Sequence, residues 1–123
     1  MPEEKNKKYD LEERTFLFAQ AVRKFIKQLP RTISNIEDCK QLTRASGSVG
    51  ANYIEANESL GKKDFLMHIK ICRKESKESK FFLRLVDTDK EFLEKQRTEL
   101  IQEAMELMLI FGSILSKSKS NED

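Results

Sequence analysis

Four segments of the chain carry apolar or small residues at alternating steps of three and four, the spacing that lines one side of an α-helix. They lie at residues 11–29, 39–60, 65–86 and 101–115. With four glycines and two prolines in 123 residues, the chain favours helices over a sheet. Short connections make successive helices antiparallel. The sequence therefore predicts an all-α fold, an antiparallel up-down-up-down four-helix bundle at residues 9–116, with disordered tails at 1–8 and 117–123.

The residues of each stripe are predicted to face the core of the bundle. In chain order they are Leu11, Thr15, Phe18, Val22, Phe25 and Leu29; Cys39, Leu42, Ser46, Val49, Tyr53, Ala56 and Leu60; Phe65, Ile69, Cys72, Ser76, Ser79, Leu83 and Val86; and Ile101, Ala104, Met108, Phe111 and Leu115. Asp10 with Glu13 has the spacing of a capping box and predicts the start of the first helix. Ser34 with Glu37 predicts the start of the second helix, and Gly61 its end.

The second helix contains two glycines, Gly47 and Gly50, each of which costs about 1 kcal/mol relative to alanine in a helix interior. A helix that accepts this cost twice usually lets another backbone approach closely. Counting back from the turn at Gly61 places residues 46–50 opposite residues 72–76. The sequence therefore predicts a tight contact between the second and third helices, with small residues on both sides.

The fourth helix carries more apolar residues than one core-facing stripe needs. Those outside the predicted stripe are Leu100, Met105, Leu107, Leu109, Ile110 and Ile114. A helix that is apolar nearly all round is usually buried nearly all round. Because most oligomers of soluble proteins contain identical chains, we expect these residues to form the interface of a homo-oligomer.

The net charge is only +2, yet residues 62–84 hold eight basic and three acidic side chains. Six of the basic ones share one side of the third helix: Lys70, Arg73, Lys74, Lys77, Lys80 and Arg84. A basic stripe of this kind predicts binding to the phosphates of RNA or DNA. The alternative is a solvated helix face on which Glu75 and Glu78 pair with the neighbouring cations.

A cluster of polar residues on the second and third helices also admits two interpretations. Its members are Arg44, Asn52, Glu55, Asn57, Glu58, Glu75 and Glu78. Antiparallel counting brings Arg44 near Glu78, and such a pair can fix the register of two helices. The other interpretation is a surface for a protein partner or a ligand, which would make the chain a protein-binding adaptor without a nucleic-acid role.

The sequence offers no constellation for catalysis, a cofactor or a metal. It contains one histidine, His68, for which we expect a solvated position, and two cysteines, Cys39 and Cys72, which we expect to be buried thiols about 16 Å apart along the bundle axis. An enzyme is therefore not expected. Residues 107–111 form the longest apolar run, far short of a membrane span, and the charged residues 1–8 do not resemble a signal peptide. We expect a cytoplasmic protein with no membrane partner.

Residues 44–58, followed by the runs at 62–65 and 71–79, resemble a known bacterial family. Its members are small four-helix-bundle proteins encoded in intervening sequences of 23S ribosomal RNA genes, and the resemblance covers about residues 9–116. That family is similar, more distantly, to the accessory variability determinant of diversity-generating retroelements. The latter is a basic pentameric barrel that associates with a reverse transcriptase and nucleic acid.

The resemblance implies a homopentamer, with RNA or DNA and a protein such as a reverse transcriptase as expected partners. It implies no catalytic residues, because the family has no agreed activity. The chain departs from the family pattern at Gly61, where serine is common, and at Ser76, where alanine is common. We expect the first change to weaken the cap of the third helix and the second to add a hydroxyl to the tight helix contact.

Overall fold

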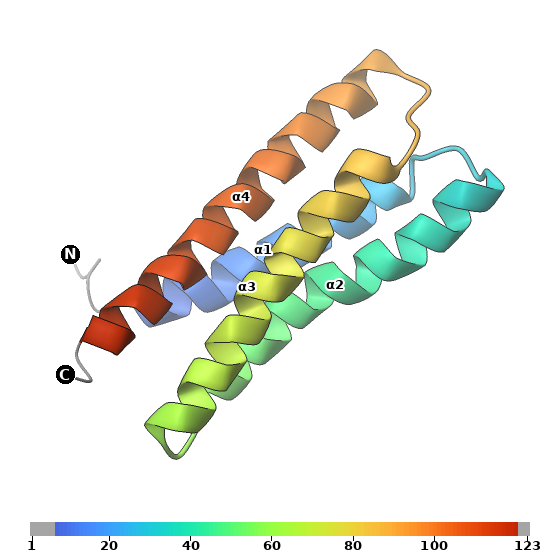
Figure 1. The fold of residues 1–123 in the computed structure, drawn as a ribbon. Helices are drawn as coiled ribbons and strands as arrows, with labels where there is room; N and C mark the ends of the chain where they lie inside the picture. Colours follow the sequence, from blue (N-terminus) through green and yellow to red (C-terminus); the bar gives the residue numbers. More distant parts are fainter. Residues whose placement is uncertain (1–6, 121–123) are drawn as a thin grey trace.

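The computed structural model describes residues 7–120, with side chains from residue 11 to residue 118. Within that range four helices follow one another: α1 (Lys7–Ile26), α2 (Ile33–Asn57), α3 (Lys62–Leu85) and α4 (Glu91–Ser120). The described residues contain no strand, so the fold is all-α and consistent with a four-helix bundle (Figure 1). Residues 7 and 8 and residues 117–120, predicted as tails, belong to α1 and α4, while the remaining tail residues lie outside the described part.

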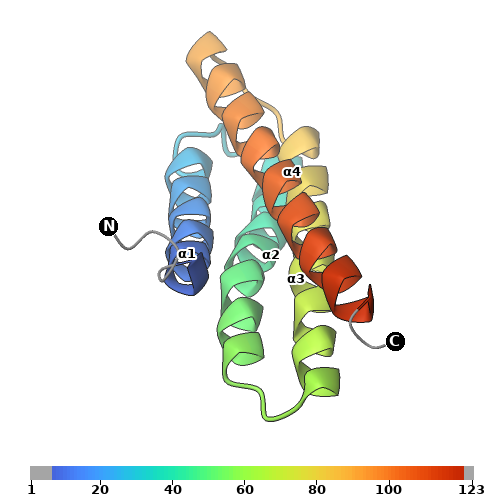
Figure 2. The ribbon, with the colours of Figure 1, turned by 90° about the vertical axis from the view of Figure 1, so that its left-hand side faces the viewer.

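Each helix packs against two others. Among the described residues α1 packs on α2 and α4 but not on α3, so α1 and α3 are diagonal to each other (Figure 2). The contact between α2 and α3 is the most extensive, and that between α1 and α4 is the smallest. The two halves of the fold are therefore packed to different extents.

The core confirms the predicted stripes of α1 and α3. The stripe residues of α1 are buried, and so are those of α3 from Ile69 onward, whereas Phe65 is only partly buried. Leu29 and Val86 are also buried, although they lie just beyond the ends of α1 and α3. On α2 the stripe is buried from Leu42 to Ala56, but Leu60 is fully exposed. The reason is that α2 ends at Asn57, before the predicted end at Gly61, so that Leu60 lies in the connection to α3.

On α4 the predicted division between core and interface is wrong at four positions. Leu100 and Leu107, expected at an oligomer interface, are buried inside the bundle, whereas the stripe residues Ile101 and Met108 are only partly buried. Apolar residues occupy so many positions of α4 that their spacing does not select one face. Leu100 and Leu107 therefore belong to the core of a single chain.

The other four predicted interface residues remain partly or largely accessible. Leu109 is 63% exposed, Met105 is half-buried, and Ile110 and Ile114 are partly buried against the core.

The helix starts differ from the predicted capping boxes. α2 begins at Ile33, where the Thr32 hydroxyl accepts a hydrogen bond from the Asn35 amide at 3.1 Å, so Thr32 rather than Ser34 is the cap. Gly61 is the N-cap of α3 and makes no side-chain hydrogen bond to the first turn. This agrees with the expectation that glycine in place of the family's common serine weakens this cap.

Buried Asn35 joins two connections between helices at one end of the fold. Its side-chain nitrogen Nδ2 donates to the carbonyl oxygens of Pro30 and Asp87, at 2.8 and 2.9 Å. Its side-chain oxygen Oδ1 accepts from the backbone amide of Asp87 at 2.8 Å. These bonds hold the α1–α2 connection against the α3–α4 connection. The sequence offered no signal for this link, because it depends on which ends of the helices meet.

The predicted tight contact between α2 and α3 is confirmed. The Cys72 thiol lies 3.3 Å from the carbonyl oxygen of Val49, and Ser46, Ser76 and Ser79 are fully buried. The Ser76 hydroxyl donates to the Cys72 carbonyl oxygen within its own helix, which satisfies the hydroxyl that this chain adds to the contact. We call this contact the α2–α3 seam.

The two glycines of α2, however, face α1 rather than α3. A Cβ atom on Gly50 would lie 2.8 Å from the Thr15 hydroxyl, and one on Gly47 would lie 3.0 Å from Nη2 of Arg23. Arg23 crosses to α2 and donates to the Thr43 carbonyl oxygen at 3.2 Å. The glycines therefore make room for side chains of α1, and serine and cysteine provide the closeness to α3.

Candidate functional site

The predicted basic residues form one accessible face of α3. Five of the six are exposed and Lys80 is half-buried; we call the set Lys70, Arg73, Lys74, Lys77, Lys80 and Arg84 the basic face. The fourteen helical steps from Lys70 to Arg84 extend it over about 21 Å. The face borders α4, where a Cβ atom on Gly112 would lie 4.0 Å from Nε of Arg73.

Glu75 and Glu78 of α3 both pair with Arg44 of α2, and the alternative interpretation holds only for the pair of Lys74 and Glu75. Glu75 is 5% exposed, and its carboxylate lies 3.3 Å from Nη1 of Arg44 on α2. Glu78 accepts a hydrogen bond from Nη2 of the same arginine, as antiparallel counting predicted. We call this three-residue group the Arg44 clasp.

Among residues 11–118, Lys74 is the one member of the basic face with a carboxylate within ion-pair distance. Its ammonium lies 3.8 Å from Oε2 of Glu75. The acidic residues Glu103 and Glu106 of α4 are bound to Arg14 of α1, both at 2.7 Å. These two acidic side chains of α4 thus pair with α1 rather than with the basic face, and five of its six cations have no ion pair among the described residues.

The remaining members of the predicted polar cluster do not converge on one site. Asn52 bonds to Ser48 and lies 3.1 Å from Nδ1 of His68 on α3, while Asn57 donates to Glu12 on α1 at 2.8 Å. Glu55 and Glu58 are exposed. Most of the cluster therefore joins α2 to its two neighbours.

His68 is not solvated as expected. Its side chain is 18% exposed, and besides the contact with Asn52 its Nε2 lies 3.6 Å from Oδ1 of Asp64. The sequence could not reveal this position, because the amide that faces the ring lies on another helix.

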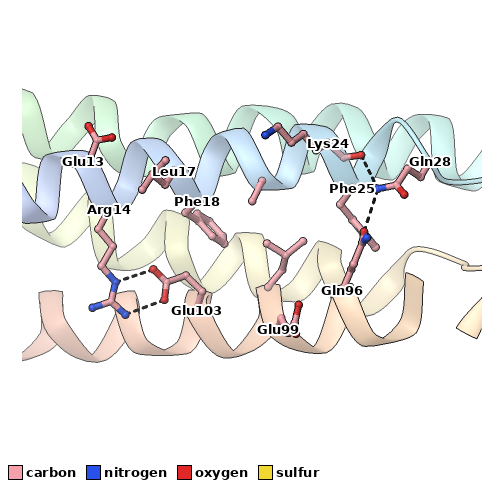
Figure 3. A pocket seen from close by; sticks show the side chains of 12 residues that line it. Glu13, Arg14, Leu17, Phe18, Lys24, Phe25, Gln28, Gln96, Glu99 and Glu103 are labelled. Atoms are coloured by element: carbon pink, nitrogen blue, oxygen red, sulfur yellow. Dashed lines mark hydrogen bonds and ion pairs between the residues drawn. The ribbon is translucent and has the colours of Figure 1, made fainter. Parts of the chain in front are cut away.

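A groove between α1 and α4 is a feature that the sequence did not predict. It has a volume of about 770 Å³, and Leu17, Phe18, Ala21, Phe25 and Leu100 supply its apolar lining. Charged and amide side chains stand at its edges (Figure 3). The available signal was the pair Leu17 and Ala21, four residues apart on α1 beside the core stripe. We call it the α1–α4 groove.

Two polar contacts bridge the α1–α4 groove. Arg14 binds Glu103 in a bidentate pair, with Nε donating at 2.7 Å and Nη2 at 2.8 Å (Figure 3). It also binds Glu106. We call these three residues the Arg14 clasp. The hydrogen bond to Glu103 raises the pKa of the Arg14 guanidinium, and hydrogen bonds from Gln102 and Arg14 lower the pKa of Glu106. Farther along, Gln28 donates to Gln96 at 3.1 Å.

The described residues offer little for covalent or metal chemistry. Both cysteines are free; burial raises the pKa of the Cys72 thiol to about 12 and also raises that of Cys39. A thiol with a raised pKa is a poor nucleophile at neutral pH. No group of three or more potential metal ligands comes together between residues 11 and 118.

Comparison with known proteins identifies the family. The family described as 23S rRNA-intervening sequence protein matches residues 7–113, which is most of the chain. The chain belongs to this family. The match includes all of α1, α2 and α3 and most of α4, so the basic face and the α1–α4 groove both lie within it.

A solved structure shares the fold. It is the crystal structure of a protein of unknown function from the S23 ribosomal protein family of Bacteroides thetaiotaomicron, with 23% identity and a TM-score of 0.74, covering 85% of this chain and 96% of the other. No curated protein matches the chain. None of the described helices combines the length and the apolar character needed to cross a bilayer.

Proposed function

We propose that this chain is a non-enzymatic, homo-oligomeric scaffold of the cytoplasm that binds nucleic acid through the basic face of α3. The observation that carries the proposal is the segregation of charge described above. Glu75 and Glu78 are held by Arg44, and the acidic residues of α4 near α1 are held by Arg14, so the cations of α3 remain available. The chain's membership in a family connected with ribosomal RNA genes agrees with this proposal.

Phosphate binding through such a face has a defined physical signature. Each cation that contacts a phosphate releases a condensed counterion, so the logarithm of the binding constant falls linearly with the logarithm of the salt concentration. The slope is about −0.7 per contact for single strands and about −0.9 for duplex DNA. A face with several accessible cations therefore predicts affinity that falls steeply as salt rises.

The proposal includes assembly of antiparallel, up-down-up-down bundles into a ring of identical chains. Exposed Leu109 and half-buried Met105 on α4, together with the exposed residues Leu17 and Ala21 of the α1–α4 groove, are surfaces that a neighbouring chain would cover. A ring repeats the basic face once per chain and strengthens its field beyond what a net charge of +2 suggests. The expected number of five chains comes from the family resemblance.

The first test is a binding assay with charge-reversed variants. Fluorescence polarisation with labelled RNA and DNA should show binding that weakens steeply with salt, and the triple variant Lys70→Glu, Lys74→Glu, Lys77→Glu should abolish it. A matched control reverses Lys27, Lys40 and Lys95, which are exposed just beyond α1, on α2 and on α4 and give the same change in net charge. If the α3 variant binds like the wild type, the basic face is not the site.

Assembly is tested by native mass spectrometry of protein purified without nuclease, sprayed from low and from high salt. We expect a fivefold mass with additional nucleic-acid mass that disappears at high salt. A monomer under both conditions would overturn the proposed ring, and a fivefold mass without nucleic acid would count against the basic face as a binding site.

A protein-binding adaptor is the competing candidate. It is favoured by exposed Ile54 on α2, next to exposed Glu55, at the edge of a second groove of about 450 Å³ between α1 and α2. Capture of partners after nuclease treatment separates the two functions, because a protein partner that binds the chain directly should persist and one bridged by nucleic acid should be lost.

A further inference from the structure

One aromatic side chain lies within the basic face. Phe81 on α3 is 52% exposed. Lys77 precedes it by four residues and Arg84 follows it by three, and side chains at these spacings are neighbours on a helix surface. The order along the helix is therefore cation, aromatic ring, cation.

A second aromatic ring restrains Phe81. The half-buried ring of Phe82 lies with its centroid 5.2 Å from that of Phe81, and the two planes meet at 82°, an edge-to-face arrangement. Because Phe82 packs against the hydrophobic core, it supports the exposed ring from the side. A restrained ring loses less conformational entropy when a ligand stacks on it.

The other exposed phenylalanines lack such surroundings. Phe16 on α1 is 56% exposed, but Glu12 and Gln20 are its neighbours four residues away on either side. Phe92 on α4 is 50% exposed; Lys95 follows it by three residues, but no cation stands three or four residues before it, where Asp89 and Thr88 precede the start of the helix. Of the three, Phe81 alone combines an exposed ring with cations before and after it on the same helix face.

Building on the proposed function, we infer that Phe81 is a platform on which a nucleotide base stacks, and that the basic face binds single-stranded RNA or DNA in preference to duplex. Binding of single strands combines a basic track for the backbone with aromatic rings for the bases. In a duplex the bases are already stacked on one another, so their faces are not available to a side chain on the protein surface. The aromatic ring gives no advantage with a duplex, while the cations serve both.

The test uses the full chain, a labelled single-stranded oligouridylate and an RNA duplex of the same length. Phe81→Leu retains an apolar contact with Phe82 but removes the aromatic face. We expect it to weaken binding of the single strand by about 5-fold to 150-fold and to leave the salt dependence unchanged. Lys77→Gln should instead reduce the magnitude of the salt slope by about 0.7. Phe16→Leu is the matched control and should bind like the wild type.

A fluorescence experiment reports stacking directly. The chain contains no tryptophan, so Phe81→Trp introduces a single indole at the proposed platform. Its emission should be quenched when the oligouridylate binds, and affinity should be retained. The emission of Phe16→Trp should not change. Circular dichroism of each variant verifies that the helices are intact.

The outcomes separate the platform from the proposed function. If the wild type binds both probes with steep salt dependence, but Phe81→Leu has no effect or the duplex is preferred, nucleic-acid binding stands and the platform is wrong. If the wild type binds neither probe, the nucleic-acid function fails and the platform falls with it. Selective loss of single-strand binding in Phe81→Leu supports both.

Discussion

The α2–α3 seam and the α1–α4 groove differ in packing although the same kind of ion pair bridges each. Arg44 joins α2 to two glutamates of α3, and Arg14 joins α1 to two glutamates of α4, with the glutamates three residues apart in both cases. Beneath the Arg44 clasp lie fully buried small residues. Beneath the Arg14 clasp lies a groove of about 770 Å³.

The comparison teaches that side-chain size, rather than charge pairing, decides how closely two helices approach in this fold. Ser76 and Ser79 on α3 let a main-chain carbonyl of α2 reach the Cys72 thiol. On the other side Phe18 and Phe25 of α1 point toward α4 and hold the helices apart (Figure 3). The closely packed side of the fold, at the α2–α3 seam, presents the basic face. The other side, at the α1–α4 groove, offers an apolar surface for a partner chain.

The largest expected contrast is in thiol reactivity, between the α2–α3 seam and the part of α2 outside it. In the Cys39→Ser variant, Cys72 should react with a thiol reagent at pH 8 at least about 1,000-fold more slowly in the folded than in the unfolded chain. The reaction requires opening of the α2–α3 seam, and the raised pKa keeps the thiol neutral. In Cys72→Ser, half-buried Cys39 should be much less protected. Equal protection of both thiols would show that the seam is no tighter than its surroundings.

The next largest contrast is expected in the loss of stability when a larger side chain is introduced. Ser76→Leu places a large side chain in the fully buried seam and should lower the free energy of unfolding by about 3 kcal/mol. Ala21→Leu places the same side chain in the α1–α4 groove, where a single chain has space, so without a neighbouring chain in the groove it should change the free energy of unfolding by no more than about 0.5 kcal/mol. Urea unfolding measures both. Similar losses in the two variants would mean that the groove is already filled, for example by a neighbouring chain.

Much of this architecture could be predicted from periodicity. The stripes of α1 and α3 are regular and bounded by polar residues, so Phe18, Val22, Ile69 and Leu83 are buried as expected. The Arg44–Glu78 pair was found by counting from a turn, which works because both helices are straight and joined by a short connection. Local pattern is sufficient where one helix face is clearly more apolar than the rest.

Three-dimensional information was needed elsewhere. The apolar residues of α4 surround the helix, so burial of Leu100 and Leu107 depended on where α1 and α3 lie. Gly47 and Gly50 revealed that something approaches α2 closely, but the sequence could not show that it is α1. The α1–α4 groove arises from the spacing of two helices distant in sequence, and residue patterns within one helix do not contain that distance.

The two clasps should differ in strength, by a smaller amount. Arg44→Ala leaves Glu75, 5% exposed, without its arginine, and should lower the free energy of unfolding by about 2 kcal/mol. Arg14→Ala should cost about 0.5 kcal/mol, because its partners are substantially solvated and water replaces the lost bonds. Urea unfolding of both variants checks the difference. A larger loss of unfolding free energy for Arg14→Ala than for Arg44→Ala would show that the Arg14 clasp contributes more to stability than the Arg44 clasp. Charge pairing, rather than the buried serines, would then be the main difference between the α1–α4 groove and the α2–α3 seam.

The smallest expected effect is in the contribution of the Arg14 clasp to the stability of the fold at low pH. Hydrogen bonds from Gln102 and Arg14 hold the pKa of Glu106 below its ordinary value. A carboxylate whose pKa is lower in the folded chain stabilises the fold above its unfolded pKa, and that contribution is lost as the pH falls through the folded pKa. Glu106→Gln should therefore reduce the drop in melting temperature between pH 5 and pH 3, which differential scanning fluorimetry can measure. Arg14→Ala should produce part of the same change, because it removes one of the two donors, and an unchanged acid response in both variants would show that the Arg14 clasp is not formed in solution.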